Sequence, residues 1–304
     1  MKTEWYIIAN PTSSSGKTRK LISKVKQLLE KQKIKYFLSL TSFSGEEIQL
    51  VDKAVASGHK AILCVGGDGT AQKVVAGIQL QKHLSPKDIL FSLIPAGTGN
   101  DWARSNNIPM SIIECIKAIK KRKARFIDVG VAKITKEKKT KTRFFLGYSG
   151  VGFDVFMLKK IQPYKKFGPL SYLVCAIMNF YKFQNIEIEI ITPNNKTQRK
   201  VFLVGVGICK YTGGGMRLIN SPKSDDGLLN ITIAQDFSKK DIARNFFKLF
   251  NGEIFKERKV LTLKANKLTI RAKNKPICCQ GDGEIFGGGK IEYSVRKKAL
   301  QFIY

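Results

Sequence analysis

Apolar and polar positions alternate along the first 130 residues in a strand and helix rhythm. Short apolar runs indicate buried strands, whereas apolar residues spaced three and four positions apart indicate amphipathic helices. The predicted strands are Glu4–Ala9, Lys35–Leu40, Ala61–Val65 and Ile89–Ile94, and the predicted helices are Lys17–Gln32, Glu46–Ser57 and Ala71–Ile78. This order predicts a parallel sheet covered by helices.

Beyond residue 126 the pattern changes to strand-like pieces joined by turn residues, which predicts an antiparallel second domain. The predicted strands are Arg125–Ile134, Arg143–Gly147, Ile186–Ile191, Lys200–Cys209, Leu228–Ala234, Val260–Leu263, Lys267–Ile270, Ile291–Val295 and Leu300–Tyr304. We therefore expect an α/β domain over 1–130 and a β-rich domain over 131–295. The last strands, 296–304, are candidates to complete the first domain.

One segment of the second domain, 153–183, has helical spacing and is interrupted at Pro163 and Pro169. It mixes aromatic and aliphatic residues with lysines, which suits a helix lying on an anionic membrane surface. A pair of core helices with solvated lysines is an equally good interpretation. The sequence leaves both open.

The charge of the chain is its most unusual bulk property. Among 304 residues, 54 are Lys or Arg and 23 are Asp or Glu, which gives a net charge of +31. Residues 1–130 carry +11 and residues 131–304 carry +20. Such an excess predicts an anionic partner, which could be nucleic acid, an acidic membrane or a phosphorylated ligand. No run is apolar enough for a membrane span or a signal peptide, so we expect a cytoplasmic protein.

Three loops rich in small residues each follow a predicted strand. They read NPTSSSGKT at 10–18, GGDGT at 66–70 and PAGTGND at 95–101. The first departs from a P-loop because Pro11 occupies a position that requires glycine. Loops at the carboxyl ends of parallel strands converge on one crevice, and small residues let backbone N–H groups approach a phosphate. The loops therefore predict a phosphate-binding site.

These motifs resemble those of the diacylglycerol kinase catalytic domain. The resemblance continues through GGGM at 213–216, SP at 221–222, DDGLL at 225–229 and QGDGE at 280–284, as in the bacterial soluble lipid kinases. It implies a Rossmann-like α/β nucleotide-binding domain followed by an antiparallel β-sandwich domain, as in NAD kinases. It also implies transfer of the γ-phosphate of ATP to a lipid hydroxyl, with diacylglycerol as the first choice of acceptor.

The resemblance further implies the residues of the site. A catalytic Mg²⁺ would be held through water by Asp68, Asp101 and Asp128. A structural Mg²⁺ would use the Asp226 carboxylate with the backbone carbonyls of Lys223 and Leu228. Glu284 matches the proton acceptor, with Asp282 beside it. The positions that match ATP contacts are Asn10, Pro11, Thr12, Ser13, Gly16, Lys17, Thr41, Gly66, Gly67, Asp68, Gly69, Thr70, Gly97 and Thr98; which serine of 13–15 contacts phosphate stays open.

Two of these acidic segments also have a simpler structural interpretation. Asp282-Gly283 is typical of a type I′ hairpin turn, which would place Glu284 at the tip of a rigid hairpin. Asp225-Asp226-Gly227 likewise reads as a turn. In both segments the turn and the functional role are compatible.

Several alternatives remain beside diacylglycerol. The acceptor could be a ceramide-like or sphingosine-like lipid, a polyprenol or phosphatidylglycerol, because no motif encodes the lipid. An NAD kinase is disfavoured by the PxGTxND form of the second loop, and a nucleic-acid-binding protein by the absence of a recognised binding motif. We expect a protein that binds a lipid substrate and no nucleic acid, at the inner face of a membrane. A homodimer is left open.

Overall fold

The computed structural model describes residues 4–12, 17–272 and 276–304. The chain divides into two compact units, which are treated separately. The first contains the chain up to Val129 together with Lys297–Tyr304, and the second contains Gly130–Arg296. No helix within the described ranges is both long and apolar enough to cross a membrane.

The first unit is built on a parallel sheet. Its strands are β1 (Trp5–Ala9), β2 (Tyr36–Leu40), β3 (Ala61–Gly66) and β4 (Leu90–Pro95), in the order β2-β1-β3-β4. The end of β14 (Glu284–Ile303) adds a further parallel strand beside β4, with Gln301 opposite Leu90. β1 and β3 are buried along their whole length, as their uninterrupted apolar runs predict.

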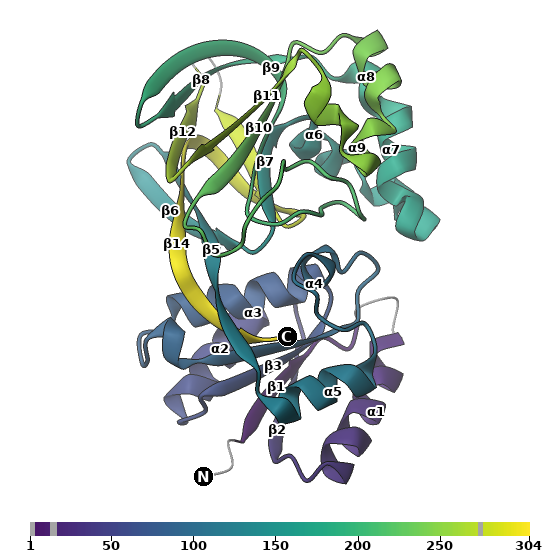
Figure 1. Ribbon diagram of the computed structural model, residues 1–304, viewed down its shortest axis with the longest axis vertical. Helices are drawn as coiled ribbons and strands as arrows, with labels where there is room; N and C mark the ends of the chain where they lie inside the picture. Colours follow the sequence, from purple (N-terminus) through teal and green to yellow (C-terminus); the bar gives the residue numbers. More distant parts are fainter. Residues whose placement is uncertain (1–3, 13–16, 273–275) are drawn as a thin grey trace. The chain divides into compact units, whose positions relative to one another are not determined.

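Helices cover this sheet. They are α1 (Lys17–Lys31), α2 (Glu46–Ala56), α3 (Asp68–Leu80), η2 (Pro86–Asp88), α4 (Asp101–Ser105) and α5 (Ile112–Lys121). α1 packs beside α5, and α2 packs along α3 (Figure 1). α5 buries Cys115, Ile116 and Ile119 and turns its lysines to solvent. The sequence pattern did not predict α4 or α5.

The second unit is an antiparallel β structure. Its strands are β5 (Ala124–Lys136), β6 (Lys139–Phe145), β7 (Tyr148–Gly152), β8 (Ile186–Thr192), β9 (Asn195–Gly207), β10 (Leu229–Gln235), β11 (Val260–Ala265), β12 (Lys267–Arg271), β13 (Ile277–Gly281) and most of β14. The order β11-β10-β9-β7-β13-β14 runs through the sheet, with β8 and β12 paired beside it. β5 and β14 each contribute residues to both units.

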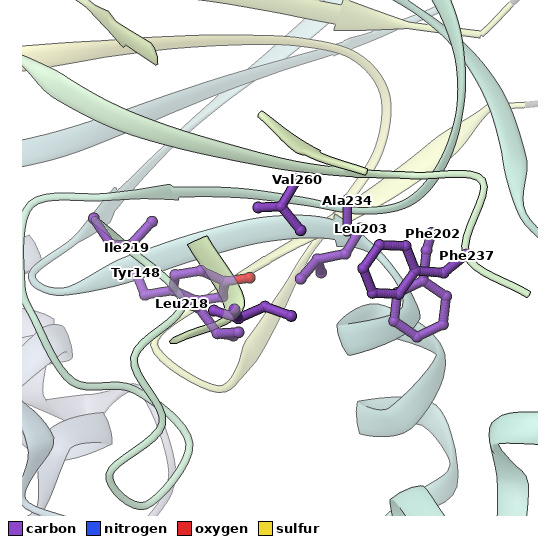
Figure 2. Close-up of a cluster of buried hydrophobic side chains, with 9 residues drawn as sticks. Tyr148, Phe202, Leu203, Leu218, Ile219, Ala234, Phe237 and Val260 are labelled. Carbon is purple, nitrogen blue, oxygen red and sulfur yellow. The ribbon is translucent and has the colours of Figure 1, made fainter. Parts of the chain in front are cut away.

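Short helices lie on one side of the second unit (Figure 1). They are α6 (Phe153–Lys160), η3 (Gln162–Leu170), α7 (Ser171–Asn179), η4 (Phe180–Lys182), α8 (Lys239–Asn245), α9 (Lys248–Asn251) and η5 (Glu253–Lys256). The core that they cover includes Phe202 and Phe237, whose rings stack with centroids 5.9 Å apart (Figure 2). Aromatic stacking of this kind fixes how the loop after β10 lies on the sheet.

The predicted fold class, an α/β domain followed by an antiparallel β domain, is confirmed. One local prediction was wrong. The strands predicted at 291–295 and 300–304 are parts of a single strand, β14. The segment at 136–143 forms a tight hairpin in which only Glu137 and Lys138 connect β5 to β6, both with positive φ. Threonines along the segment favour pairing over a loop.

Candidate active site

The loops predicted to bind phosphate lie together at one edge of the parallel sheet. Ala9 pairs with Val65 and Gly66 pairs with Pro95, so β1, β3 and β4 end at the same level. The Thr41 N–H donates to the Ala9 carbonyl at 3.0 Å and brings the end of β2 to the same edge. The sheet therefore gathers the residues from three separate sequence motifs.

Two of these loops touch through glycine backbone. A Cβ atom added to Gly67 would lie 2.9 Å from the Gly97 Cα, and one added to Gly97 would lie 2.7 Å from the Gly67 Cα. Any larger residue at either position would push the loops apart. Asn100, which has φ of 50°, closes the second loop, because its side chain accepts from the Gly97 N–H and donates to the Gly97 carbonyl, both at 2.9 Å. The sequence analysis gave Asn100 no role, although it stands inside the PAGTGND motif.

Asp68 and Asp101 are brought together at this edge. The Asp68 carboxylate accepts the backbone N–H groups of Asp101 at 3.0 Å and Trp102 at 3.1 Å. A Cβ on Gly99 would lie 3.4 Å from Asp68 Oδ2 and 3.6 Å from Asp101 Oδ2, so both carboxylates border the same glycine. Burial raises the pKa of the Asp68 carboxyl above its usual range, and the two N–H donors oppose that shift. A cation beside this pair would stabilise both charges.

The first loop is described only in part. The Asn10 side chain accepts from both the backbone N–H and the hydroxyl of Thr12, at 3.0 and 2.8 Å, and so shapes the turn that contains Pro11. Ser13 and Gly16 lie outside the described residues, and of Lys17 only the backbone, at the start of α1, is described. In the other two loops Thr98 is exposed, Gly69 is half-buried and Thr70 is buried.

Asp128 has a different environment from the other two acids of the predicted magnesium network. It is fully buried on β5, and its Oδ1 accepts the backbone N–H of Lys298 at 2.7 Å. Lys298 has φ of 49°, so the carboxylate supports a local irregularity in β14. Among the described residues no group of three or more His, Cys, Asp or Glu side chains has an arrangement suited to a metal ion.

The segment predicted to be catalytic, 280–284, forms the hairpin that its sequence predicts. Gly281 pairs with Glu284, and the two residues between them, Asp282 and Gly283, have φ of 47° and 87°. Two consecutive positive φ values identify a type I′ turn, in which Gly283 takes up the left-handed conformation without strain. Glu284 begins β14 and its side chain is exposed.

Asp282 binds the protein backbone. Its Oδ1 accepts the N–H groups of Gly147 and Tyr148, each at 3.0 Å, and its Oδ2 accepts that of Leu146 at 2.6 Å. The Asp282 N–H donates in return to the Tyr148 carbonyl at 2.8 Å. This carboxylate thus anchors the hairpin to the bend between β6 and β7. Sequence spacing could not reveal this contact, because the partners are about 135 positions apart.

The residues predicted to hold a structural metal lie in the loop before β10. Asp226 Oδ1 accepts the Leu228 N–H at 3.0 Å, as in an Asx turn, and its Oδ2 lies 3.9 Å from Lys264 Nζ. Lys223 is exposed in the same loop. The turn interpretation is thereby confirmed, and an oxygen of Asp226 still faces a cationic group.

Comparisons with known proteins agree with this arrangement. Residues 4–132 match the family model of the diacylglycerol kinase catalytic domain, and residues 147–304 match that of the YegS C-terminal NAD kinase beta sandwich-like domain. A diacylglycerol kinase of Staphylococcus carnosus is 24% identical over 95% of this chain and 90% of its own length. A Xanthomonas oryzae protein named "Probable lipid kinase YegS-like" is 25% identical over 93% of this chain and 90% of its own length.

Solved structures share the fold. A diacylglycerol kinase structure from Bacillus anthracis aligns over 99% of this chain and 96% of its own, with a TM-score of 0.72 at 21% identity. The structure of a yeast NADH kinase aligns over 99% of this chain and 83% of its own, with a TM-score of 0.58 at 12% identity. The two-unit architecture is therefore common to kinases that have different acceptors.

Proposed function

Because the chain belongs to the diacylglycerol kinase-like family of lipid kinases, we propose that it transfers the γ-phosphate of ATP to the hydroxyl group of diacylglycerol. Two observations support the proposal, one in each unit. The first unit has small-residue loops at one edge of its parallel sheet, and the second unit has an exposed carboxylate, Glu284, on a hairpin.

The loops supply the positions for ATP. Phosphates would lie against the backbone N–H groups of the Gly66–Thr70 and Gly97–Asn100 loops, at the N-terminal end of α3, where the helix dipole favours negative charge. The close contact of Gly67 with Gly97 keeps side chains away from that edge. Phosphoryl transfer depends mainly on such positioning and on charge neutralisation.

The donor set at this edge fits Mg²⁺. Asp68 and Asp101 provide carboxylate oxygens, which are the ligands that this ion prefers. When bound, Mg²⁺ would neutralise charge on the phosphates. Asp128 would act through the backbone of β14. The Asp226 carboxylate, with the backbone carbonyls of Lys223 and Leu228, would hold a second, structural ion.

Glu284 would act as the general base. Its carboxylate accepts the proton of the lipid hydroxyl while that oxygen bonds to the γ-phosphorus and the bond from phosphorus to the bridging oxygen of ADP breaks. A hydroxyl has a pKa far above neutrality, so a carboxylate within hydrogen-bond reach lowers the barrier at the moment of attack. The products are phosphatidic acid and ADP.

Replacing the carboxylate tests this role. Glu284→Gln should lower kcat by at least about a hundredfold, the usual contribution of a general base, and should leave the ATP affinity and melting temperature near those of the unchanged protein. Transfer from radiolabelled ATP to diacylglycerol in mixed micelles measures it. Glu292→Gln, on the same strand, is the matched control. Near-normal turnover by Glu284→Gln would refute the assignment, and NAD offered as acceptor tests the alternative kinase.

The acyl chains have a candidate site inside the second unit. A cavity of about 710 Å³ lies against α6, β8, β9 and β13, and its volume is typical of a ligand site. Val155, Phe156, Phe183, Ile186, Ile188 and Ile277 supply apolar lining, and Lys159, Arg199 and Lys200 supply positive charge. We place the lipid tails there because the apolar lining suits hydrocarbon.

One cysteine reports directly on occupancy of this cavity. Cys278 lines it and is half-buried, whereas the other five cysteines are buried. Diacylglycerol should slow alkylation of Cys278 by a maleimide at least about fivefold, and glycerol should not. Peptide mass spectrometry measures the modification, and Cys278→Ser controls for background labelling. Equal labelling with and without lipid would show that the acyl chains do not bind in this cavity. It would not contradict the proposed kinase activity.

The segment at 153–183 divides into a core side and an outer side. Met157, Ile161 and Cys175 form a buried cluster, which agrees with the core interpretation for α6. The outer helical face, defined as Phe167, Ile177, Met178 and Tyr181, is 46–55% exposed. Lys166 and Lys182 lie over the Phe167 and Tyr181 rings, at 5.4 Å each. We propose that this face docks on an anionic bilayer, to which apolar groups and lysines both contribute.

A further inference from the structure

The turn before Glu284 is held by the side chain of Gln280. Gln280 is only 4% exposed, and its Oε1 accepts the backbone N–H of Gly283 at 3.1 Å. Gly283 is the residue immediately before Glu284, so this bond fixes the Asp282–Gly283 peptide, one residue before the proposed base. A turn residue with a positive φ would otherwise be free to rotate towards solvent.

The other end of the same amide binds a carboxylate. Gln280 Nε2 donates to Asp154 Oδ2 at 2.9 Å, from the first turn of α6. A carboxylate can only accept and a backbone N–H can only donate, so the partners dictate which way the amide faces. Replacing Asp154 by a side chain without an acceptor would remove this hydrogen bond from the amide nitrogen.

The backbone of Gln280 is fixed as well. The Ser149 hydroxyl donates to the Gln280 carbonyl and lies 3.1 Å from the hydroxyl oxygen of Tyr293. Both Ser149 and Tyr293 are fully buried. Gln280 is therefore held by three hydrogen bonds, so a shift of Asp154 would move the Gln280 amide and, with it, the Gly283 N–H group.

We propose that Asp154 is a positioning residue for phosphoryl transfer. It acts through the Gln280 amide to set the direction in which the Glu284 side chain points from the hairpin. The inference rests on the proposed role of Glu284 as base. Asp154 contacts the hairpin through the side-chain amide of Gln280. Its charge is costly in this setting, because burial raises the pKa of its carboxyl group to about 6. The hydrogen bonds from Gln280 and Val155 offset part of that cost.

Steady-state kinetics of four variants test the inference. Asp154→Ala and Gln280→Leu should each lower kcat about ten- to a hundredfold with the KM for ATP unchanged, because a misplaced base slows only the transfer step. Asp154→Asn keeps an oxygen that can accept from Gln280 Nε2 and should recover most of the loss. Thr232→Val is the matched control, since the Thr232 hydroxyl is buried and has no hydrogen-bond partner in the described structure.

The double variant separates positioning from general destabilisation. If Asp154 acts only through Gln280, Asp154→Ala combined with Gln280→Leu should lower kcat no further than Gln280→Leu alone. Independent structural damage would instead multiply the two losses. Multiplied losses, or a rise in the KM for ATP that accounts for the effect, would overturn the inference.

Hydrogen exchange provides a readout that needs no turnover. Peptides covering residues 281–285 should exchange faster in Gln280→Leu and Asp154→Ala than in the unchanged protein or in Asp154→Asn. Unchanged exchange at Gly283 would overturn the inference even if every variant were inactive. If exchange responds as expected but the unchanged protein phosphorylates no diacylglycerol, the failure lies with the proposed function.

Discussion

Three acidic side chains make different structural contacts in this chain. Asp68 accepts two N–H groups at the start of α4, Asp128 supports Lys298, and Asp282 anchors a hairpin. Asp128 is fully buried and the other two are half-buried, and each of the three carboxylates accepts backbone N–H. Resemblance identified most of these positions, but only the coordinates show that their immediate partners are backbone N–H groups.

Asp154 should make stability depend on pH. Although the residue is half-buried as a whole, its carboxyl end is enclosed, and its pKa is raised by burial from 3.8 to about 6. A raised pKa in the folded state means that stability from this group is complete below about pH 4 and is lost as the pH rises through 6. Its neighbours Cys279 and Tyr293 do not titrate in that window, because burial raises the pKa of both.

Removing the charge should therefore stabilise the protein only at higher pH. Asp154→Asn should raise the free energy of unfolding by about 1–2 kcal/mol at pH 8, a value reduced from the full shift because solvent reaches part of the residue. The gain should shrink as the pH falls below 6 and vanish near pH 4. Thermal melts between pH 4 and pH 8 measure it. An equal gain at every pH would mean that the Asp154 carboxyl group does not ionise.

Among the elements, those with strong periodicity were predicted well. The predicted helices Lys17–Gln32 and Glu46–Ser57 end within one residue of α1 and α2, because their apolar stripes face the sheet. α3 begins three residues before the predicted Ala71, because Asp68, Gly69 and Thr70 already form its first turn. α8 was missed because seven residues carry too little periodicity, although Ser238 and Asp241 form a capping box.

The contacts that hold the hairpin of β13 and β14 in place could not be predicted from the sequence. Asp282-Gly283 predicted the turn, but the three N–H donors of Leu146, Gly147 and Tyr148 come from another part of the chain. Sequence spacing carries no signal for contacts at that separation. The same holds for Gln280, the first residue of the QGDGE motif, because its bond to Asp154 joins positions 126 apart.

Asp282 should stabilise this hairpin strongly. Asp282→Ala leaves three buried N–H groups without their acceptor and should lower the free energy of unfolding by about 3–5 kcal/mol. Glu137→Ala is the matched control, because Glu137 has the same φ of 47° at a hairpin turn and an exposed side chain. Melting temperatures compare the two variants. If both fell equally, the cost would come from the backbone conformation and not from the carboxylate.

At the level of the whole molecule, the sequence predicted the order and type of both units. It predicted this much because a parallel and an antiparallel sheet impose different hydrophobic patterns. The sequence could not show which residues of the segment at 153–183 are buried and which are exposed, because both kinds occur within single helical turns. Whether two copies of the chain associate stays a prediction.

Membrane association should depend on the outer helical face. Ile177→Ser combined with Met178→Ser should weaken binding to vesicles that contain phosphatidylglycerol about tenfold or more, because two exposed apolar side chains no longer enter the bilayer. Ile113→Ser removes an equally exposed residue from α5 as the control. Co-sedimentation at low and high salt measures binding. Binding that is unchanged in the double variant, or equal on neutral vesicles, would place the docking surface elsewhere.

Because the end of β14 belongs to the first unit, that unit is completed only late in synthesis. Residues 297–304 supply the strand beside β4, and Phe302 packs its ring 5.4 Å from that of Trp102. A ribosome makes β1 to β4 first, yet their sheet lacks its neighbour until the end of β14 has left the exit tunnel. The first unit must therefore wait for the second unit to be translated, so that no partly made chain holds a finished first sheet.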